Sequence, residues 1–158
     1  MKPTTTSAAY DSRPDTLEHI AKVAGYMEEA TGTLTYRAAV HDRSKLEDPE
    51  KAMFDEFTPK LRDLTYGSPE YKACTAAMGD ALKHHYAHNS HHPEHYTDGV
   101  AGMSLFDLIE MLCDWKAAGE RHADGGNIRR SLDLNVDRFA ISPQLEHILN
   151  RTIEEMGW

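Results

Sequence analysis

Apolar residues recur at steps of three and four along most of the chain, which is the spacing of one helical face. Near the N-terminus the repeat comprises Leu17, Ile20, Val23 and Met27, and Ser12 is placed to cap a helix that begins there. A second stripe, near the C-terminus, consists of Leu145, Ile148, Leu149, Ile153 and Met156. No segment of useful length alternates between apolar and polar residues, so the pattern predicts an all-α fold.

Capping residues and helix breakers divide this pattern into about six to seven helices. The helices are expected from Ser12, from Thr33 to about Leu46, from Asp48-Pro49, from Ser68-Pro69 to the first histidines, from Ser104, over 127–139 and over 143–156. The segment 89–102, which contains Pro93 and two glycines, predicts an ordered loop. We therefore expect a compact helical domain over residues 12–158, preceded by a flexible arm over residues 1–11.

The composition narrows the class of ligand. A chain of 158 residues with 40% hydrophobic content is long enough for one packed core. Its formal net charge of −9 argues against an extended nucleic-acid surface and favours a small molecule. A small anion remains compatible with this charge, since a bound cation reverses the local field.

The location of the protein is predicted from what the sequence lacks. It contains no apolar signal core and no stretch near the roughly 20 apolar residues of a membrane helix. Cys74 and Cys113 follow neither a disulfide nor a metal-site spacing, which is typical of a reducing compartment. A cytoplasmic protein without a membrane partner is expected, and a homo-oligomer stays open.

Six of the ten histidines fall between residues 84 and 95, and His41-Asp42 lies upstream of them. Imidazole and carboxylate donors together suit divalent Mn, Fe, Co, Ni or Zn better than Ca or Mg. A flexible His-rich tract that binds metal adventitiously is the alternative interpretation. The interleaved Tyr86 and Pro93 and the helical patterns on both sides favour an ordered centre with one or two ions.

Cationic residues near this pair point to an anionic substrate. Lys45 follows His41 by four residues, which places it on the same helical face. Its ammonium group could hold a phosphoryl oxygen beside the metal. Arg37 and Arg138 are candidates for phosphate or base contacts, as are Arg129 and Arg130.

The order of these residues resembles the HD superfamily of metal-dependent phosphohydrolases, which are helical. The order is His19, His41-Asp42, His84/His85, His91-His92 and Asp114. The segment from His41 to Lys45 resembles the His-Asp-x-x-Lys motif of the branch that hydrolyses cyclic dinucleotides. The Gly-Tyr-Pro of that branch is missing after Asp98-Gly99, so cyclic dinucleotides are not expected as substrates.

The chain is also similar, over almost its whole length, to a family of short phage and bacterial proteins of unknown function. The shared pattern includes His-Asp-x-Ser-Lys, Tyr-Gly-Ser, His-His-Pro-Glu-His-Tyr and Glu-Met-x-x-Asp-Trp. This similarity predicts kinship without assigning an activity.

The resemblance to the HD superfamily implies a ligand set and a reaction. It makes His19, His41, Asp42 and Asp114 the primary ligands, and His85 and His91, with His84 and His92 as near alternates, would hold a second ion. A metal-activated water would attack phosphorus while Lys45 stabilises charge on the equatorial oxygens. The proton donor to the leaving group would be Glu94 or His95. The residues predicted to orient the ligand histidines are Asp107 and Glu110, and Glu110 could also ligate.

Three functions follow from these observations. The first is a metal-dependent phosphohydrolase that acts on a nucleotide or a similar phosphate ester. The second is a non-haem di-iron oxygenase, because a minority branch of the same superfamily uses four histidines and two aspartates. The third is a non-catalytic phage protein that binds a nucleotide signal or a host protein.

Overall fold

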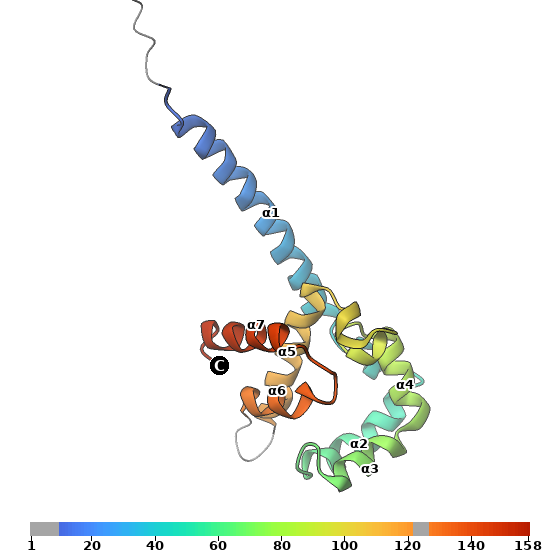
Figure 1. The fold of residues 1–158 in the computed structure, drawn as a ribbon. Helices are drawn as coiled ribbons and strands as arrows, with labels where there is room; N and C mark the ends of the chain where they lie inside the picture. The colour runs from blue at the N-terminus through green and yellow to red at the C-terminus, as the bar shows by residue number, and fades with distance from the viewer. Residues whose placement is uncertain (1–9, 122–126) are drawn as a thin grey trace, which may run out of the picture. The chain divides into compact units, whose positions relative to one another are not determined.

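The computed structural model describes residues 10–121 and 127–158, and this part of the chain is helical throughout, without a strand (Figure 1). The α-helices are α1 (Arg13–Val40), α2 (Lys51–Arg62), α3 (Pro69–Ala77), α4 (Gly79–His88), α5 (Leu105–Glu120), α6 (Ile128–Val136) and α7 (Pro143–Glu155). Short 3-10 segments are η1 (Arg43–Leu46), η2 (Pro93–His95) and η3 (Gly99–Gly102). The expected all-α class and the expected number of helices are confirmed. None of the described helices combines the length and the apolar character needed to cross a bilayer.

The chain divides into two units, residues 1–36 and residues 37–158. The described part of the first unit is a single helical segment of α1, with no second layer of its own. Most of the predicted N-terminal arm, residues 1–9, lies outside the described residues. The predicted extents of the arm and of the helical domain therefore stay predictions.

Helix α1 continues through the position where a second helix was expected to begin. The hydroxyl groups of Thr31, Thr33 and Thr35 each donate to the carbonyl four residues earlier, at 2.9–3.2 Å. These bonds let threonine remain within a helix instead of capping a new one. The predicted helix from Thr33 to about Leu46 is thus wrong: α1 ends at Val40, and residues 43–46 form η1.

The fourth predicted helix is divided in two by a glycine. Ser68 caps α3 as expected, since its hydroxyl accepts from the Tyr71 backbone N–H at 3.1 Å. The helix then breaks before Gly79, whose φ of 53° is readily adopted only without a side chain. Helix α4 restarts there and carries His84 and His85.

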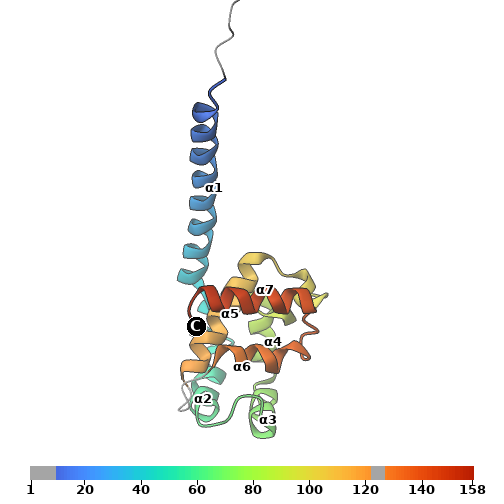
Figure 2. The same ribbon diagram turned by 60° about the vertical axis from the view of Figure 1, so that its left-hand side comes forward.

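Helices α5, α6 and α7 pack around the main core, as Figures 1 and 2 show. Ser104 caps α5 as expected and forms a capping box with Asp107, and Ser142 caps α7. The core residues include Leu108, Met111, Leu112, Leu132, Leu149 and Ile153. One side of α5 is fixed by this core, so Glu110 and Asp114 are held on a rigid element.

Candidate metal centre

Four segments of the second unit bring imidazole and carboxylate groups together. His41 and Asp42 follow the end of α1, His85 lies on α4, and Asp114 lies on α5. The loop between α4 and η2 adds two more histidines. Donor atoms converge within 4.8 Å of one another in three groups of described residues: Asp42, His85, His91 and His92; His41, Asp42 and Asp114; and His41, His91 and Glu110. Below, "the cluster" means His41, Asp42, His85, His91, His92 and Asp114.

Asp42 presents its two carboxylate oxygens to different histidines. Oδ1 lies 3.3 Å from His85 Nε2 and 3.5 Å from His91 Nε2. Oδ2 lies 3.4 Å from His41 Nε2, which is 3.7 Å from Asp114 Oδ1. Two donors that bind one ion at about 2.1 Å are separated by about 3.0 Å at a right angle and about 3.4 Å in a tetrahedron. The spacing therefore fits ligands of a transition metal, with Asp42 shared between two positions.

The deep side of the cluster contains polar atoms without a hydrogen bond. Among the described residues, Asp42 Oδ1 and His91 Nε2 are buried side-chain atoms with no hydrogen-bond partner. Such atoms are rare because leaving one unsatisfied costs about 1–3 kcal/mol. A cation bound to both would remove that cost, and the donor types are those that a divalent transition metal prefers. The residues present thus fit a metal ion.

Glu110 orients two of the histidines. Its Oε1 accepts from His41 Nδ1 at 2.8 Å and from His91 Nδ1 at 3.1 Å. Its Oε2 accepts from Arg37 Nε at 2.7 Å, and Arg37 also donates to Asp107 at 2.6 Å. A carboxylate on Nδ1 fixes the tautomer that leaves Nε2 free for a metal. Of the two predicted roles, the geometry favours orientation over ligation for Glu110.

Glu50 makes the equivalent contacts on the other side, and the sequence did not predict it. Its Oε2 lies 3.0 Å from His85 Nδ1, and its Oε1 lies 2.7 Å from His84 Nδ1. Ser44 donates to the same carboxylate at 3.0 Å. Glu50 is fully buried, although it follows Glu47 and Asp48 in a stretch that reads as an acidic surface. Its local sequence carries no signal for this role.

The cluster holds its histidines in different protonation states. Hydrogen bonds to Asp114 and Glu110 raise the pKa of His41 to about 10. Burial, together with the neighbouring His91 and His85, lowers the pKa of His92 to about 3. Burial acts to raise the pKa of Asp114, but the hydrogen bond from His41 and the charge of Lys45 outweigh it and lower the pKa to about 2. A metal must displace the His41 proton, whereas His92 already has a lone pair to donate.

The members of the cluster differ in exposure, and the more exposed edge, the open side, carries His41 and Asp114. The side chains of His85 and His91 are 2% exposed, whereas those of His41 and Asp114 are 29% and 23% exposed. Lys45 stands on this open side, where its ammonium group pairs with Asp42 Oδ2 and lies 4.9 Å from the centre of the Phe54 ring. His41, Asp114 and Lys45 thus form the partly exposed edge of the cluster.

Several predicted site residues have other partners. His84 bonds to Glu50 and belongs to none of the three donor groups found among the described residues. Glu94 pairs with Arg138 at 2.7 Å, and His95 Nδ1 donates to the Tyr86 carbonyl at 2.9 Å. Arg37 is engaged by Glu110 and Asp107, as described above. The catalytic or substrate-binding roles of these residues stay predictions.

His19 belongs to the first unit, on α1. Its role as a metal ligand stays a prediction, because the cluster is described within residues 37–158 alone.

The fold and the cluster define an all-helical protein with a buried group of imidazoles and carboxylates that could hold a metal ion. The chain belongs to a family of unknown function, DUF5662, whose model matches residues 8–155. Searches of curated proteins and of solved structures gave no match.

Proposed function

We propose that this protein is a metal-dependent phosphohydrolase that acts on a nucleotide or a similar phosphate ester. One observation carries the proposal: two buried donor atoms without hydrogen bonds, Asp42 Oδ1 and His91 Nε2, belong to a cluster whose open side carries Lys45. The order of the candidate ligands, from His41-Asp42 to Asp114, resembles that of the HD superfamily, and this resemblance points to the same chemistry.

Asp42 and the neighbouring Lys45 each have a physical role in such a reaction. Asp42 lies between the imidazoles of His41 and His85 and is placed to share its two oxygens between two cation positions. Lys45 supplies a fixed positive charge on the open side, which can bind a phosphoryl oxygen and stabilise negative charge that builds up on it. A divalent ion held by these ligands would supply a water acidified enough to attack phosphorus.

The proposed metal is Mn, Fe, Co, Ni or Zn, because these ions accept mixed imidazole and carboxylate ligands. The proposed location is the cytoplasm. Cys74 and Cys113 are both free, which fits a reducing compartment.

The test combines elemental analysis of the purified protein with a hydrolysis screen. Mono-, di-, tri- and cyclic nucleotides are incubated with protein reconstituted with each of the five metals. We expect phosphate or nucleoside release that requires metal and falls at least about 100-fold in Asp42→Asn, since that variant loses an anionic ligand. The matched control is Asp55→Asn, which changes an exposed aspartate paired with Lys51.

Full metal occupancy with no turnover of any nucleotide would contradict the phosphohydrolase. Tight nucleotide binding without turnover would instead support a non-catalytic binding protein.

A second candidate is a non-haem di-iron oxygenase. The observation that favours it is the donor set of the cluster, four imidazoles and two carboxylates. Protein purified without oxygen would then contain iron and show a visible spectrum that changes when oxygen is admitted. A colourless protein that is active with Zn or Mn would eliminate this candidate.

A further inference from the structure

A cavity of about 500 Å³ lies within the second unit and is lined in part by α5, the helix that also carries Asp114 of the cluster. Its walls come from the end of α2 and the turn that follows, from the C-terminal half of α5, and from α6. The wall includes Tyr66, Trp115, Ala118, Asn127, Leu134 and Asn135. Sites for small organic molecules have volumes of about 300–1,000 Å³, so this cavity is large enough for one.

Helix α5 connects the cavity to the cluster. Asp114, a member of the cluster, is followed directly by Trp115 in the cavity wall. Ala118 lies four residues after Asp114 and therefore on the same helical face, about 6 Å further along the axis. A molecule in which one sugar joins a phosphate to a ring could place the phosphate at the cluster and the ring in the cavity at the same time.

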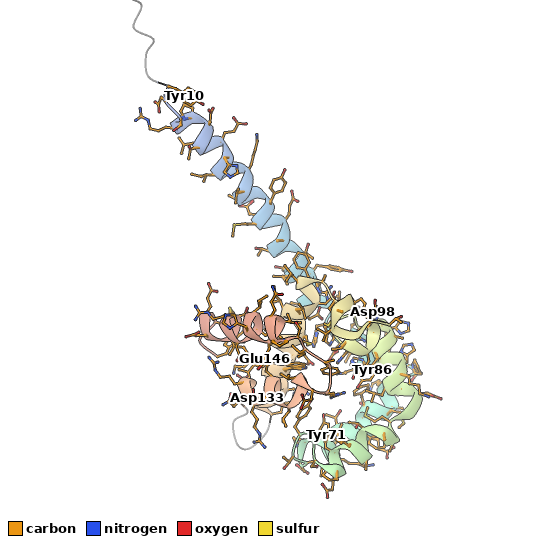
Figure 3. The ribbon with its side chains drawn as sticks, viewed as in Figure 1. Tyr10, Tyr71, Tyr86, Asp98, Asp133 and Glu146 are labelled. Atoms are coloured by element: carbon orange, nitrogen blue, oxygen red, sulfur yellow. The ribbon has the colours of Figure 1, made fainter. Side chains whose placement is uncertain are left out.

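A second connection runs through aromatic side chains and one arginine. The Tyr86 ring, labelled in Figure 3, is centred 5.0 Å from the ring of His92 in the cluster. Arg138 interacts with Tyr86 and donates to the Tyr66 hydroxyl at 3.3 Å. Tyr66 lines the cavity. A chain of neighbouring side chains thus links His92 of the cluster to Tyr66 in the cavity wall.

The walls of the cavity fit a flat ring that has polar edges. Trp115 is half-buried and stacks on Phe139 with an angle of 12° between the rings, which leaves an ordered aromatic wall. Leu134 adds an apolar surface, and the amides of Asn127 and Asn135 offer both donors and acceptors. Arg62 and Arg130 also line the cavity. Guanidinium groups in general stack on aromatic rings.

We infer that this cavity receives the aromatic ring of the phosphate-ester substrate, and that a nucleobase is the ring chemistry its walls fit. The inference rests on the proposed function for the placement of the phosphate group. It assigns substrate specificity to Trp115, Ala118 and Leu134.

The experiment measures binding, so that it does not depend on turnover. In a Trp158→Phe parent, Trp115 is the single tryptophan and reports on the cavity by its fluorescence. Zinc-loaded protein is titrated with the four common nucleoside monophosphates and with ribose 5-phosphate, which has the sugar and phosphate without the ring. We expect at least one nucleotide to bind about tenfold or more tightly than ribose 5-phosphate, the range typical of base stacking on aromatic side chains.

Two variants locate this preference in the cavity. Ala118→Leu fills part of the cavity from a helical position and should reduce the preference to within about threefold. Ala117→Leu makes the same change at the exposed neighbouring residue, outside the wall, and should keep it. Leu134→Ala, at a position that is 48% exposed, is the second cavity variant and should weaken nucleotide binding while the fold is kept.

The outcomes separate this inference from the proposed function. Ring-dependent binding without hydrolysis would uphold the cavity and overturn the phosphohydrolase. Hydrolysis of nucleotides and ribose 5-phosphate at equal efficiency would uphold the phosphohydrolase and overturn the cavity assignment. The assignment also fails if folded Ala118→Leu and Leu134→Ala proteins both keep the full preference.

Discussion

Glu110→Gln is the substitution that tests the cluster most directly. The carboxylate of Glu110 accepts from His41 Nδ1, from His91 Nδ1 and from Arg37 Nε. The glutamine side chain has the same shape but only one oxygen. Whichever way its amide is turned, an N–H group faces one of these donors, so the three contacts cannot all be kept.

The structure sets the size of the expected effect. Removing an outer partner of one metal-binding histidine typically lowers metal affinity by about 10- to 100-fold. Turned with its oxygen toward the histidines, the glutamine keeps both imidazole contacts but supplies no negative charge to strengthen the imidazoles as ligands. We therefore expect the lower end, about tenfold, or about 1.4 kcal/mol. The assay is a competition between the protein and a chromogenic chelator for Zn²⁺ at pH 7.5.

Two controls separate orientation from stability. Arg37→Gln removes the ion pairs of Arg37 but leaves both imidazole contacts of Glu110, so its Zn²⁺ affinity should stay within about threefold of wild type. Glu120→Gln changes a surface glutamate on the same helix and should have no effect. If folded Glu110→Gln binds Zn²⁺ within threefold of wild type, the assignment of Glu110 as the orienting carboxylate is refuted.

Three further predictions concern the cluster and its support. Glu50→Gln should lower Zn²⁺ affinity by about tenfold in the same competition assay, because the neutral amide supplies no negative charge to strengthen His85 as a ligand. Exposed Glu47→Gln should leave the affinity unchanged, and an unchanged affinity in Glu50→Gln as well would show that the Glu50 carboxylate is not needed. The pKa of His41, about 10, means that this histidine is protonated at neutral pH and that metal binding must release its proton. The Zn²⁺ affinity should therefore rise with pH below 10. Calorimetry in buffers of different ionisation enthalpy should detect the released proton. A Zn²⁺ affinity that does not change with pH would contradict the displacement of the His41 proton by the metal. Gly102→Ala places a Cβ 2.9 Å from Tyr96 Cβ and should disturb the Tyr96 bond to Asp107, at a cost of about 1–3 kcal/mol in urea unfolding. The control Gly25→Ala has open space around its new methyl group and should be neutral or slightly stabilising, and equal stability of the two variants would refute the close contact.

The parts of the fold that depend on local sequence were predictable. Ser104 and Ser68 cap helices as expected, because a hydroxyl that accepts from a backbone N–H three residues later is a local signal. Thr33 carries the same signal but lies inside α1, where its hydroxyl bonds backwards to Glu29. The sequence around a threonine does not decide between these two bonds.

The candidate site likewise contains residues that the sequence predicted and residues that it did not. Residue type and order were enough to select His41, Asp42, His85 and Asp114, since few side chains can ligate a transition metal. Glu50 was missed because its function comes from burial against histidines 34 and 35 residues away. The position of Lys45 was expected from a helical register, but Asp42 and Lys45 instead lie in a turn after α1 and in η1.

The backbone at Asp42 has a consequence for protein engineering. Its φ of 55° is a left-handed conformation that glycine, asparagine and aspartate adopt with little strain and that most other residues resist. Glutamate, the other natural carboxylic acid, is therefore disfavoured at position 42 by chain geometry as well as by length. A saturation library at this position sorted for folding alone should be enriched in Asn and Gly, and the same library sorted for retained metal should return the aspartate.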